Sequence, residues 1–218
     1  MKYLLLLSFT LFCSSLLHAQ QAVYLFSYFK GNGEDGLHLA YSRDGLQWTS
    51  LHNDSSVLKP IVGTDKLMRD PCIIRGGDGI FHMVWTTGWK DRYIGYASSS
   101  DLLNWSEQRT IPVMEHEPTA RNSWAPELTY DKKNNEYLVY WSTTIPGHFK
   151  NEGSEDNYNH RVYFSSTKDF KTFTPSKILI DPGFNCIDAT IVSDQDGYRV
   201  FLKDETLKPA KKNLRTGT

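Results

Sequence analysis

The stretch Ser42-Arg43-Asp44-Gly45-Leu46-Gln47-Trp48 recurs twice along the chain, as Ser99-Ser100-Asp101-Leu102-Leu103-Asn104-Trp105 and as Thr167-Lys168-Asp169-Phe170-Lys171-Thr172-Phe173. In each copy an aspartate precedes an aromatic residue by four positions, and successive aspartates are 57 and 68 residues apart. A fixed period of a few tens of residues is typical of architectures in which similar units pack against their neighbours. The sequence therefore predicts a repeat protein.

A second motif repeats with the same rhythm in a different phase. Asp70-Pro71-Cys72-Ile73 aligns with Ala125-Pro126-Glu127-Leu128 and with Asp188-Ala189-Thr190-Ile191, at steps of 55 and 63 residues. Two copies are followed eight residues later by an Asp-Gly pair, at 78–79 and 196–197, and Asp-Gly between apolar runs indicates a hairpin. Each unit is thus predicted to contain an inner strand, a hairpin, a strand pair and the Asp-x-x-x-aromatic turn.

The chain contains many short segments rich in Val, Ile, Tyr, Phe and Trp, bounded by Gly, Asp, Asn or Ser, which is the pattern of strands. No window has an apolar period of a helix, so the predicted fold class is all-β. Repeated units of about four strands are typical of β-propeller blades, and the two in-phase repeats favour this fold over the alternative, a β-sandwich. By this period the chain contains about three and a half blades. Strands are expected at 22–29, 37–42, 72–75, 80–86, 93–98, 136–142, 161–166, 187–192 and 198–202.

The two ends of the chain differ from the strand-rich part. Residues 1–19 combine a basic start, an apolar run and a small residue at Ala19, which is the pattern of a cleaved signal peptide. The run is shorter than the roughly 20 residues of a membrane-spanning helix, so we expect a secreted or periplasmic protein with no membrane span. The mature part, residues 20–218, is predicted to be one partial propeller domain. Its last segment, 207–218, has three Lys, one Arg and few apolar residues, and is expected to be loose chain without a strand.

Composition narrows the classes of partner. Lys and Arg number 24 against 25 Asp and Glu, a formal net charge of −1, whereas a nucleic-acid partner would need a concentrated basic face. No nucleic-acid partner is therefore expected. Only Cys72 and Cys186 lie beyond the predicted signal peptide, which is too few for a disulfide scaffold, and buried free thiols are favoured over a bridge. Aromatic residues make up 13% of the chain, which suits both a sheet-rich core and stacking against sugars.

Asp70 and Asp188 occupy equivalent positions in two repeats, at the start of the predicted inner strand. Because the inner strands of a propeller surround one channel, these residues, 118 apart in sequence, are expected to meet in one pocket. Two neighbouring carboxyl groups raise each other's pKa, which leaves one as a base and the other as its tuner. Taken singly, each aspartate is more often a turn or backbone-bonding residue, and Ala125 indicates that folding does not require Asp at this position.

Four segments together resemble glycoside hydrolase family 43 in order and spacing. They are Leu67-Met68-Arg69-Asp70-Pro71, Phe81 to Trp89, Trp124-Ala125-Pro126-Glu127, and Cys186-Ile187-Asp188-Ala189-Thr190 followed by Asp196-Gly197. The resemblance spans nearly all of residues 20–218. It implies an inverting glycosidase on a five-bladed β-propeller, with Asp70 as general base, Asp188 as pKa modulator and a glutamate of the next blade as general acid.

The general acid of this resemblance has no counterpart in the sequence. Repeating the step from Asp188 places the glutamate at about residue 245, beyond Thr218. Proton transfer to the leaving group contributes about 10²- to 10⁴-fold, so hydrolysis by this chain is expected to be weakened. Glu127 is a substitute acid or, as the favoured alternative, a supporting carboxylate, because it lies a step deeper than Ala125 on the same strand face.

Trp89 and Trp124, together with Glu127, are the predicted substrate-binding residues, because sugar rings pack their apolar faces against aromatic planes. Packing between blades is the equal alternative for both tryptophans. The resemblance implies an exo-acting α-L-arabinofuranosidase on side chains of plant polysaccharides. A β-xylosidase, a galactosidase, and a carbohydrate-binding or non-functional fragment stay as alternatives. No cofactor is expected, and no metal-ligand spacing surrounds the histidines; a structural calcium ion in the channel is left open.

Overall fold

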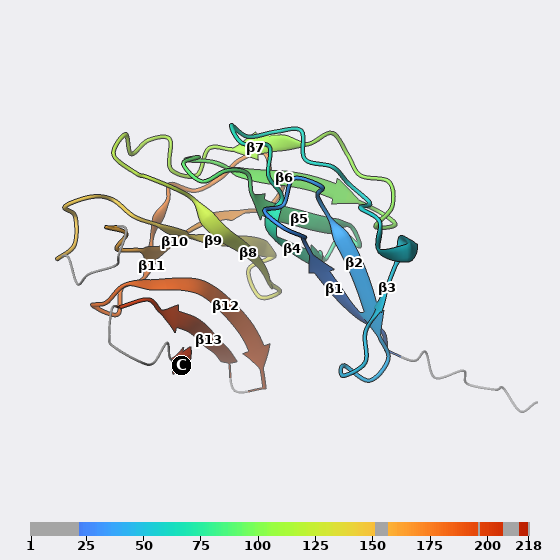
Figure 1. Ribbon diagram of the computed structural model, residues 1–218. Coiled ribbons are helices and arrows are strands. Elements are labelled where there is room, and N and C mark those ends of the chain that lie inside the picture. The colour runs from blue at the N-terminus through green and yellow to red at the C-terminus, as the bar shows by residue number, and fades with distance from the viewer. Residues whose placement is uncertain (1–21, 151–156, 196, 207–213, 218) are drawn as a thin grey trace, which may run out of the picture.

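The computed structural model describes residues 22–150, 157–195, 197–206 and 214–217. Strands of these residues form four antiparallel sheets that follow one another in chain order (Figure 1). A short 3-10 turn, η1 (His52–Asp54), separates the first two sheets along the chain. The predicted signal peptide, residues 1–19, lies outside the described residues.

Each sheet is a meander in which the strand order in space follows the order in sequence. The first sheet consists of β1 (Tyr24–Tyr28), β2 (His38–Ser42) and β3 (Thr49–Ser50). The second consists of β4 (Arg69–Arg75), β5 (Phe81–Thr86), β6 (Ile94–Ser99) and β7 (Arg109–Ile111). The third consists of β8 (Trp124–Asp131), β9 (Glu136–Thr143), β10 (Arg161–Thr167) and β11 (Lys177–Ile180). The fourth consists of β12 (Cys186–Asp194), β13 (Gly197–Asp204) and β14 (Leu214–Gly217).

The first strands of the four sheets lie next to one another. Strand β1 contacts β4, β4 contacts β8, and β8 contacts β12 (Figure 1). Meander sheets whose first strands meet around an axis are the blades of a propeller. The predicted all-β fold of propeller blades is therefore confirmed, with four blade sheets in the described residues where about three and a half were expected from the repeat length.

Strands β3, β7, β11 and β14 were not predicted from the sequence. Strand β8 was predicted only as the inner strand of the repeated motif that contains Ala125. The expectation of loose chain after residue 206 is wrong for β14, which pairs with β13 from Lys203↔Leu214 to Val200↔Gly217. Backbone groups make these ladder bonds, so a segment with few apolar side chains can still add a strand to a sheet edge. A hairpin was predicted at residues 196–197. Asp196 lies outside the described residues, but the antiparallel pairing of β12 with β13 reaches Asp194↔Gly197, as a hairpin at this place requires.

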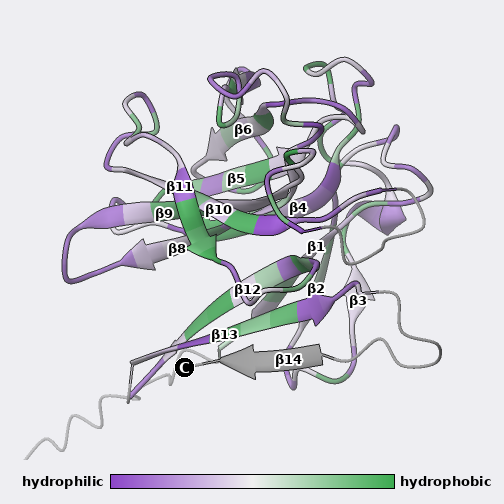
Figure 2. Ribbon diagram, turned by 90° about the vertical axis from the view of Figure 1, so that its left-hand side faces the viewer, coloured by the Kyte–Doolittle hydropathy of each residue, from purple (hydrophilic) through white to green (hydrophobic). Residues whose placement is uncertain are grey.

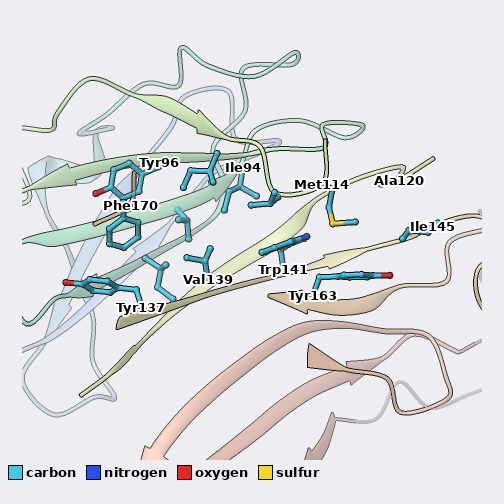
Figure 3. Packing of buried hydrophobic residues seen from close by; sticks show 14 residues of the cluster. Ile94, Tyr96, Met114, Ala120, Tyr137, Val139, Trp141, Ile145, Tyr163 and Phe170 are labelled. Carbon is cyan, nitrogen blue, oxygen red and sulfur yellow. The ribbon is translucent and has the colours of Figure 1, made fainter. Parts of the chain in front are cut away.

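Hydrophobic side chains fill the spaces between successive sheets. Between the second and third sheets, Ile94 and Tyr96 pack in one cluster with Val139, Trp141 and Phe170 (Figure 3). Figure 2 shows hydrophobic segments along the strands and hydrophilic residues in many of the loops. The clusters of the neighbouring spaces contain Leu37, Leu39, Met68, Met83, Trp85 and Ala97 on one side, and Tyr140, Val162, Cys186, Ala189 and Leu202 on the other. Burial of these faces holds the blades in a fixed arrangement, which fixes the positions of the inner strands.

Asp44, Asp101 and Asp169 form the same turn in the first three sheets. Each carboxylate accepts hydrogen bonds from the backbone N–H groups two and three residues later, at 2.7–2.9 Å. These bonds hold the pKa of each carboxyl below its usual range, at about 2 for Asp169. The repeat that reveals the fold is therefore a structural turn, and the candidate site lies elsewhere.

Candidate active site

Three of the inner strands carry a β-bulge near their start. The pairing register shifts between Arg69 and Cys72 on β4, and at the equivalent steps of β8 and β12. At the bulge the backbone is left-handed, with φ of 50° at Asp70, 45° at Ala125 and 56° at Asp188. Aspartate tolerates this conformation better than most side chains, and a bulge bends its strand and redirects a side chain. The local backbone thus explains why the second sequence motif repeats.

The three bulge residues meet at one place in the fold. Asp70, Ala125 and Asp188 all line two adjoining cavities, which we call the mouth pocket, of about 220 Å³, and the channel pocket, of about 390 Å³. The structure therefore brings the two predicted aspartates together, as expected from their equivalent positions in two repeats. The mouth pocket is also lined by Arg69, Thr86, Trp89, Trp124, Ile187, Lys203 and Glu205. The channel pocket is also lined by Leu25, Phe26, Ser27, Pro71, Cys72, Ile73, Pro126, Glu127 and Thr190.

Asp70 has the environment of a carboxyl group with a raised pKa. Burial raises its pKa above the ordinary value, and the negative charge of Asp188 acts in the same direction. The charge of Arg69 and a hydrogen bond from Thr86 Oγ1 to Asp70 Oδ2, at 3.2 Å, oppose this rise. A carboxylate with a raised pKa is a stronger base than an exposed one, which is the property that activation of a water molecule requires.

Asp188 is paired with a cation. Lys203 Nζ donates to Asp188 Oδ2 at 3.0 Å and lies 2.9 Å from Glu205 Oε1. Burial acts to lower the pKa of Lys203, but its bonds to Glu205 and Asp188 outweigh that effect and raise the pKa. The two aspartates of the pocket therefore have different surroundings: Asp70 faces a hydroxyl, whereas Asp188 faces an ammonium group.

Glu127 lies in the channel pocket with both carboxylate oxygens engaged. Thr190 Oγ1 donates to Oε1 at 2.5 Å, and the hydroxyl of Tyr140 donates to Oε2 at 2.9 Å. The Tyr140 hydroxyl in turn accepts the backbone N–H of Ile191 at 3.1 Å. Burial raises the pKa of Glu127. Because these bonds join the third sheet to the fourth, the geometry favours a supporting carboxylate over a free proton donor or a direct sugar contact.

Trp89 and Trp124 form one wall of the mouth pocket. Their rings meet edge to face, with centroids 5.6 Å apart and planes at 87°, and the indole N–H of Trp124 donates to the carbonyl of Trp89 at 3.1 Å. The Arg69 guanidinium lies 4.6 Å from the centroid of the Trp89 ring and 4.8 Å from that of Phe29. Trp89 keeps 42% of its surface exposed, so it has room for a stacking ligand.

Trp124 is held more tightly than Trp89. Its ring centroid lies 4.8 Å from that of Tyr158 and 5.2 Å from that of His160, which is buried. Burial lowers the pKa of His160 to about 4, so this imidazole is neutral at physiological pH. Trp124 therefore positions the wall of the pocket, and Trp89 offers its exposed face.

Cys72 and Cys186 are both free; Cys186 is buried, as expected, whereas Cys72 is only partly buried. Burial raises the pKa of Cys72 to about 12 and that of Cys186 to about 11, so both sulfurs are protonated and unreactive. Among the described residues, no group of three or more His, Cys, Asp or Glu is arranged to hold a metal ion. The described part of the chain also has no helix that is long and apolar enough to cross a bilayer.

Sequence reasoning missed four charged or polar residues of the mouth pocket: Arg69, Thr86, Lys203 and Glu205. A signal for two of them exists in the register. Thr86 pairs with the residue before Asp70, and Lys203 pairs with the residue before Asp188. Thr86 and Lys203 can be found from the sequence by pairing the residues of each hairpin outward from its turn. This works only if the bulge is known, because the bulge shifts the pairing of the two strands.

Comparison with known proteins gives the family. Over residues 20–215 the chain matches the family described as a probable glycosyl hydrolase domain, which is related to glycoside hydrolase family 43. The α-L-arabinofuranosidase of Bifidobacterium longum subsp. longum is 26% identical over 198 residues, covering 80% of this chain and 18% of that protein.

Two solved structures share the fold. The α-L-arabinofuranosidase from Lactobacillus brevis has a TM-score of 0.51 and 20% identity, covering 68% of this chain and 48% of that chain. Xyloglucan PUL GH43B from Bacteroides ovatus has a TM-score of 0.56 and 14% identity, covering 89% of this chain and 36% of that chain. The chain thus spans less than half the length of each of these relatives. Because the family match itself extends over residues 20–215, the protein belongs to the probable glycosyl hydrolase domains related to glycoside hydrolase family 43.

Proposed function

We propose that this chain is part of an exported, exo-acting α-L-arabinofuranosidase that acts on side chains of plant polysaccharides by an inverting mechanism. The observation that carries the proposal is the shared lining of the mouth pocket by Asp70 and Asp188. The arabinofuranosidase of B. longum, 26% identical to this chain, supports the choice of sugar. The reaction requires carboxyl groups and water, so no cofactor is included in the proposal.

In the proposed reaction, Asp70 takes a proton from a water molecule whose oxygen attacks the anomeric carbon. The bond between that carbon and the leaving oxygen breaks, and a general acid supplies a proton to the leaving oxygen. Burial of Asp70 raises its pKa and so makes it a stronger base. In an inverting enzyme the acid lies about 6.5–9.5 Å from the base, leaving space for the water. We assign Asp188 to tuning the charge of Asp70, and we expect the acid from a further blade beyond residue 218.

Trp89 is the proposed platform for the sugar ring. Its exposed face borders the same pocket as the two aspartates, and its other contacts fix its orientation. The backbone N–H of Trp89 donates to Asp65 Oδ2 at 2.8 Å, which anchors the loop that carries the ring. A sugar stacked on Trp89 would therefore lie within a small pocket whose polar groups are the candidate catalytic residues.

The test uses two α-L-arabinofuranosides that differ in their leaving group, one aryl and one alkyl. A dinitrophenyl group departs without protonation, so hydrolysis of this substrate should need the base and not the acid. We expect measurable release from the dinitrophenyl glycoside, release from a methyl glycoside weaker by about 10²- to 10⁴-fold beyond its intrinsic reactivity, and β-L-arabinofuranose as the first product by proton NMR. Asp70→Asn should abolish release, whereas Asp44→Asn, at a turn that lines neither pocket, should not.

Other sugars are outcomes of the same experiment. Preferential hydrolysis of aryl β-xyloside or aryl galactoside would replace arabinofuranose and keep the mechanism. Binding of arabinofuranosyl oligosaccharides without release from any aryl glycoside would favour a carbohydrate-binding fragment. Absence of both binding and release would overturn the proposal for this chain.

A further inference from the structure

Lys203 faces the bulge of the fourth sheet from the neighbouring strand. On β13 its backbone pairs with Ile187, the residue before Asp188. In the second sheet Thr86 holds the corresponding place, because it pairs with Arg69, the residue before Asp70. Each bulge aspartate is thus bonded by the side chain that faces it across the hairpin: Asp70 by a hydroxyl at 3.2 Å and Asp188 by an ammonium at 3.0 Å.

The ammonium group of Lys203 places a positive charge in the mouth pocket that does not titrate near neutral pH. Its bonds to Asp188 and Glu205 raise its pKa, so it stays protonated throughout the neutral range. Its effect also extends to Asp70, whose pKa it lowers. The titratable and charged groups around the two aspartates are Arg69 on β4, Glu127 on β8, His160 just before β10, Lys203 on β13 and Glu205 just after β13.

Two ionised aspartates in a small pocket need a counter-charge, because like charges close together oppose ionisation. Arg69 is the other cation of the mouth pocket, and its charge lowers the pKa of Asp70 more than that of Lys203 does. Its guanidinium, however, lies over the rings of Phe29 and Trp89 and donates to Asn32 Oδ1 at 3.0 Å. Lys203, in contrast, bonds a bulge aspartate directly.

We propose that Lys203 is the positioning residue of the carboxyl pair: it fixes the Asp188 carboxylate at the mouth pocket and balances its charge, so that Asp70 can act on water as a carboxylate. This inference rests on the proposed function. Asp188 then acts on Asp70 as half of an ion pair rather than as a bare negative charge, and the pocket can hold both aspartates in their ionised form at neutral pH.

The test compares Lys203→Met, which removes the charge, with Lys203→Arg, which retains it. Lys30→Met is the matched control, because Lys30 has a similar exposed fraction, 42% against 37%, and loses a comparable ion pair, with Asp54, away from the mouth pocket. The side-chain carboxyl carbon of Asp70 is followed by NMR against pH, with its signal assigned from Asp70→Asn. We expect the titration midpoint of Asp70 to move to higher pH in Lys203→Met and to stay in place in Lys203→Arg and Lys30→Met.

An unchanged Asp70 midpoint in folded Lys203→Met would overturn the inference, as would a Lys203→Arg variant that behaves like Lys203→Met. Because Lys203 is partly exposed, the Met variant should fold, and Lys203→Gln serves as a second neutral variant. The acidic limb of the pH profile with the dinitrophenyl substrate should move in the same direction as the midpoint. The carboxyl titration requires no turnover, so it decides the role of Lys203 even where hydrolysis, and with it the proposed function, fails.

Discussion

Thr86 donates its hydroxyl proton to Asp70 Oδ2 at 3.2 Å, and its oxygen accepts the backbone N–H of Ala125 at 2.9 Å. One side chain of the second sheet therefore bonds the candidate base and the bulge of the third sheet. A hydroxyl has a single proton, so the bond from the Ala125 N–H leaves that proton for Asp70. The orientation of the candidate base thus depends on a contact between blades.

Replacing Thr86 with valine should raise the pKa of Asp70, because the hydrogen bond that favours its carboxylate form is lost. It should also lower the free energy of unfolding by about 1–3 kcal/mol, because the Ala125 N–H loses its acceptor. Carboxyl NMR titration and urea unfolding measure the two effects. Thr86→Ser keeps the hydroxyl and should leave the Asp70 titration in place. The same Asp70 midpoint in wild type and Thr86→Val would contradict the assigned bond.

Ala125 occupies a left-handed backbone conformation, with φ of 45°, that is unfavourable for a residue with a Cβ atom. Ala125→Gly should therefore raise the free energy of unfolding by about 0.5–1 kcal/mol, the relieved strain being partly offset by the greater freedom of glycine in the unfolded chain. Ala189→Gly, on β12 but outside the left-handed positions, is the matched control and should be destabilising. Loss of stability in Ala125→Gly comparable to that in Ala189→Gly would show that the bulge is not strained.

Trp89 and Trp48 are equally exposed, at 42% and 44%, but only Trp89 lines the mouth pocket. Trp89→Ala should weaken binding of an arabinofuranosyl oligosaccharide about tenfold, which corresponds to about 1.4 kcal/mol. Trp48→Ala should leave the affinity unchanged. Isothermal titration calorimetry on the Asp70→Asn background measures both without turnover. Equal affinities for the two tryptophan variants would remove Trp89 from the binding site.

His160 should make the protein less stable in mild acid. Its pKa in the folded state, about 4, lies below the ordinary value of 6.5, so the unfolded chain binds the proton more readily. The stability that the neutral imidazole contributes is thus complete above about pH 6.5 and is lost as pH falls toward 4, by about 2 kcal/mol between pH 7 and pH 5. Asp70 and Glu127, with raised pKa values, act in the opposite direction, since the unfolded chain releases their protons first as pH rises.

The contribution of His160 can be isolated by comparing variants. Urea unfolding at pH 7 and pH 5 should show a difference that is smaller by about 2 kcal/mol in His160→Gln than in wild type. His52→Gln, at an exposed turn, should behave as wild type. An unchanged pH dependence in His160→Gln would mean that His160 is protonated in the folded protein.

Much of the fold follows from local patterns. Asp44, Asp101 and Asp169 each accept hydrogen bonds from backbone groups within three residues. The turn therefore depends only on a short stretch of sequence, and its recurrence reveals the blades. The sequence misses β14 because that strand is held by backbone pairing with β13 and not by an apolar pattern. Strand β8 is recognised only through its motif, because a bulge at Ala125 and the following Pro126 interrupt its alternation.

By itself, the sequence determined the repeat, the all-β fold class and the equivalence of Asp70, Ala125 and Asp188, because strand alternation and turn bonding depend on neighbours along the chain. Only the tertiary structure decided what each of these residues contacts. Three contacts join residues whose meeting depends on blade packing and on the register shift of each bulge: the ion pair of Asp188 with Lys203, the hydrogen bond from the Ala125 N–H to Thr86 Oγ1, and the hydrogen bond from Thr190 to Glu127. Those contacts are set by side-chain burial between sheets, which a one-dimensional period does not encode.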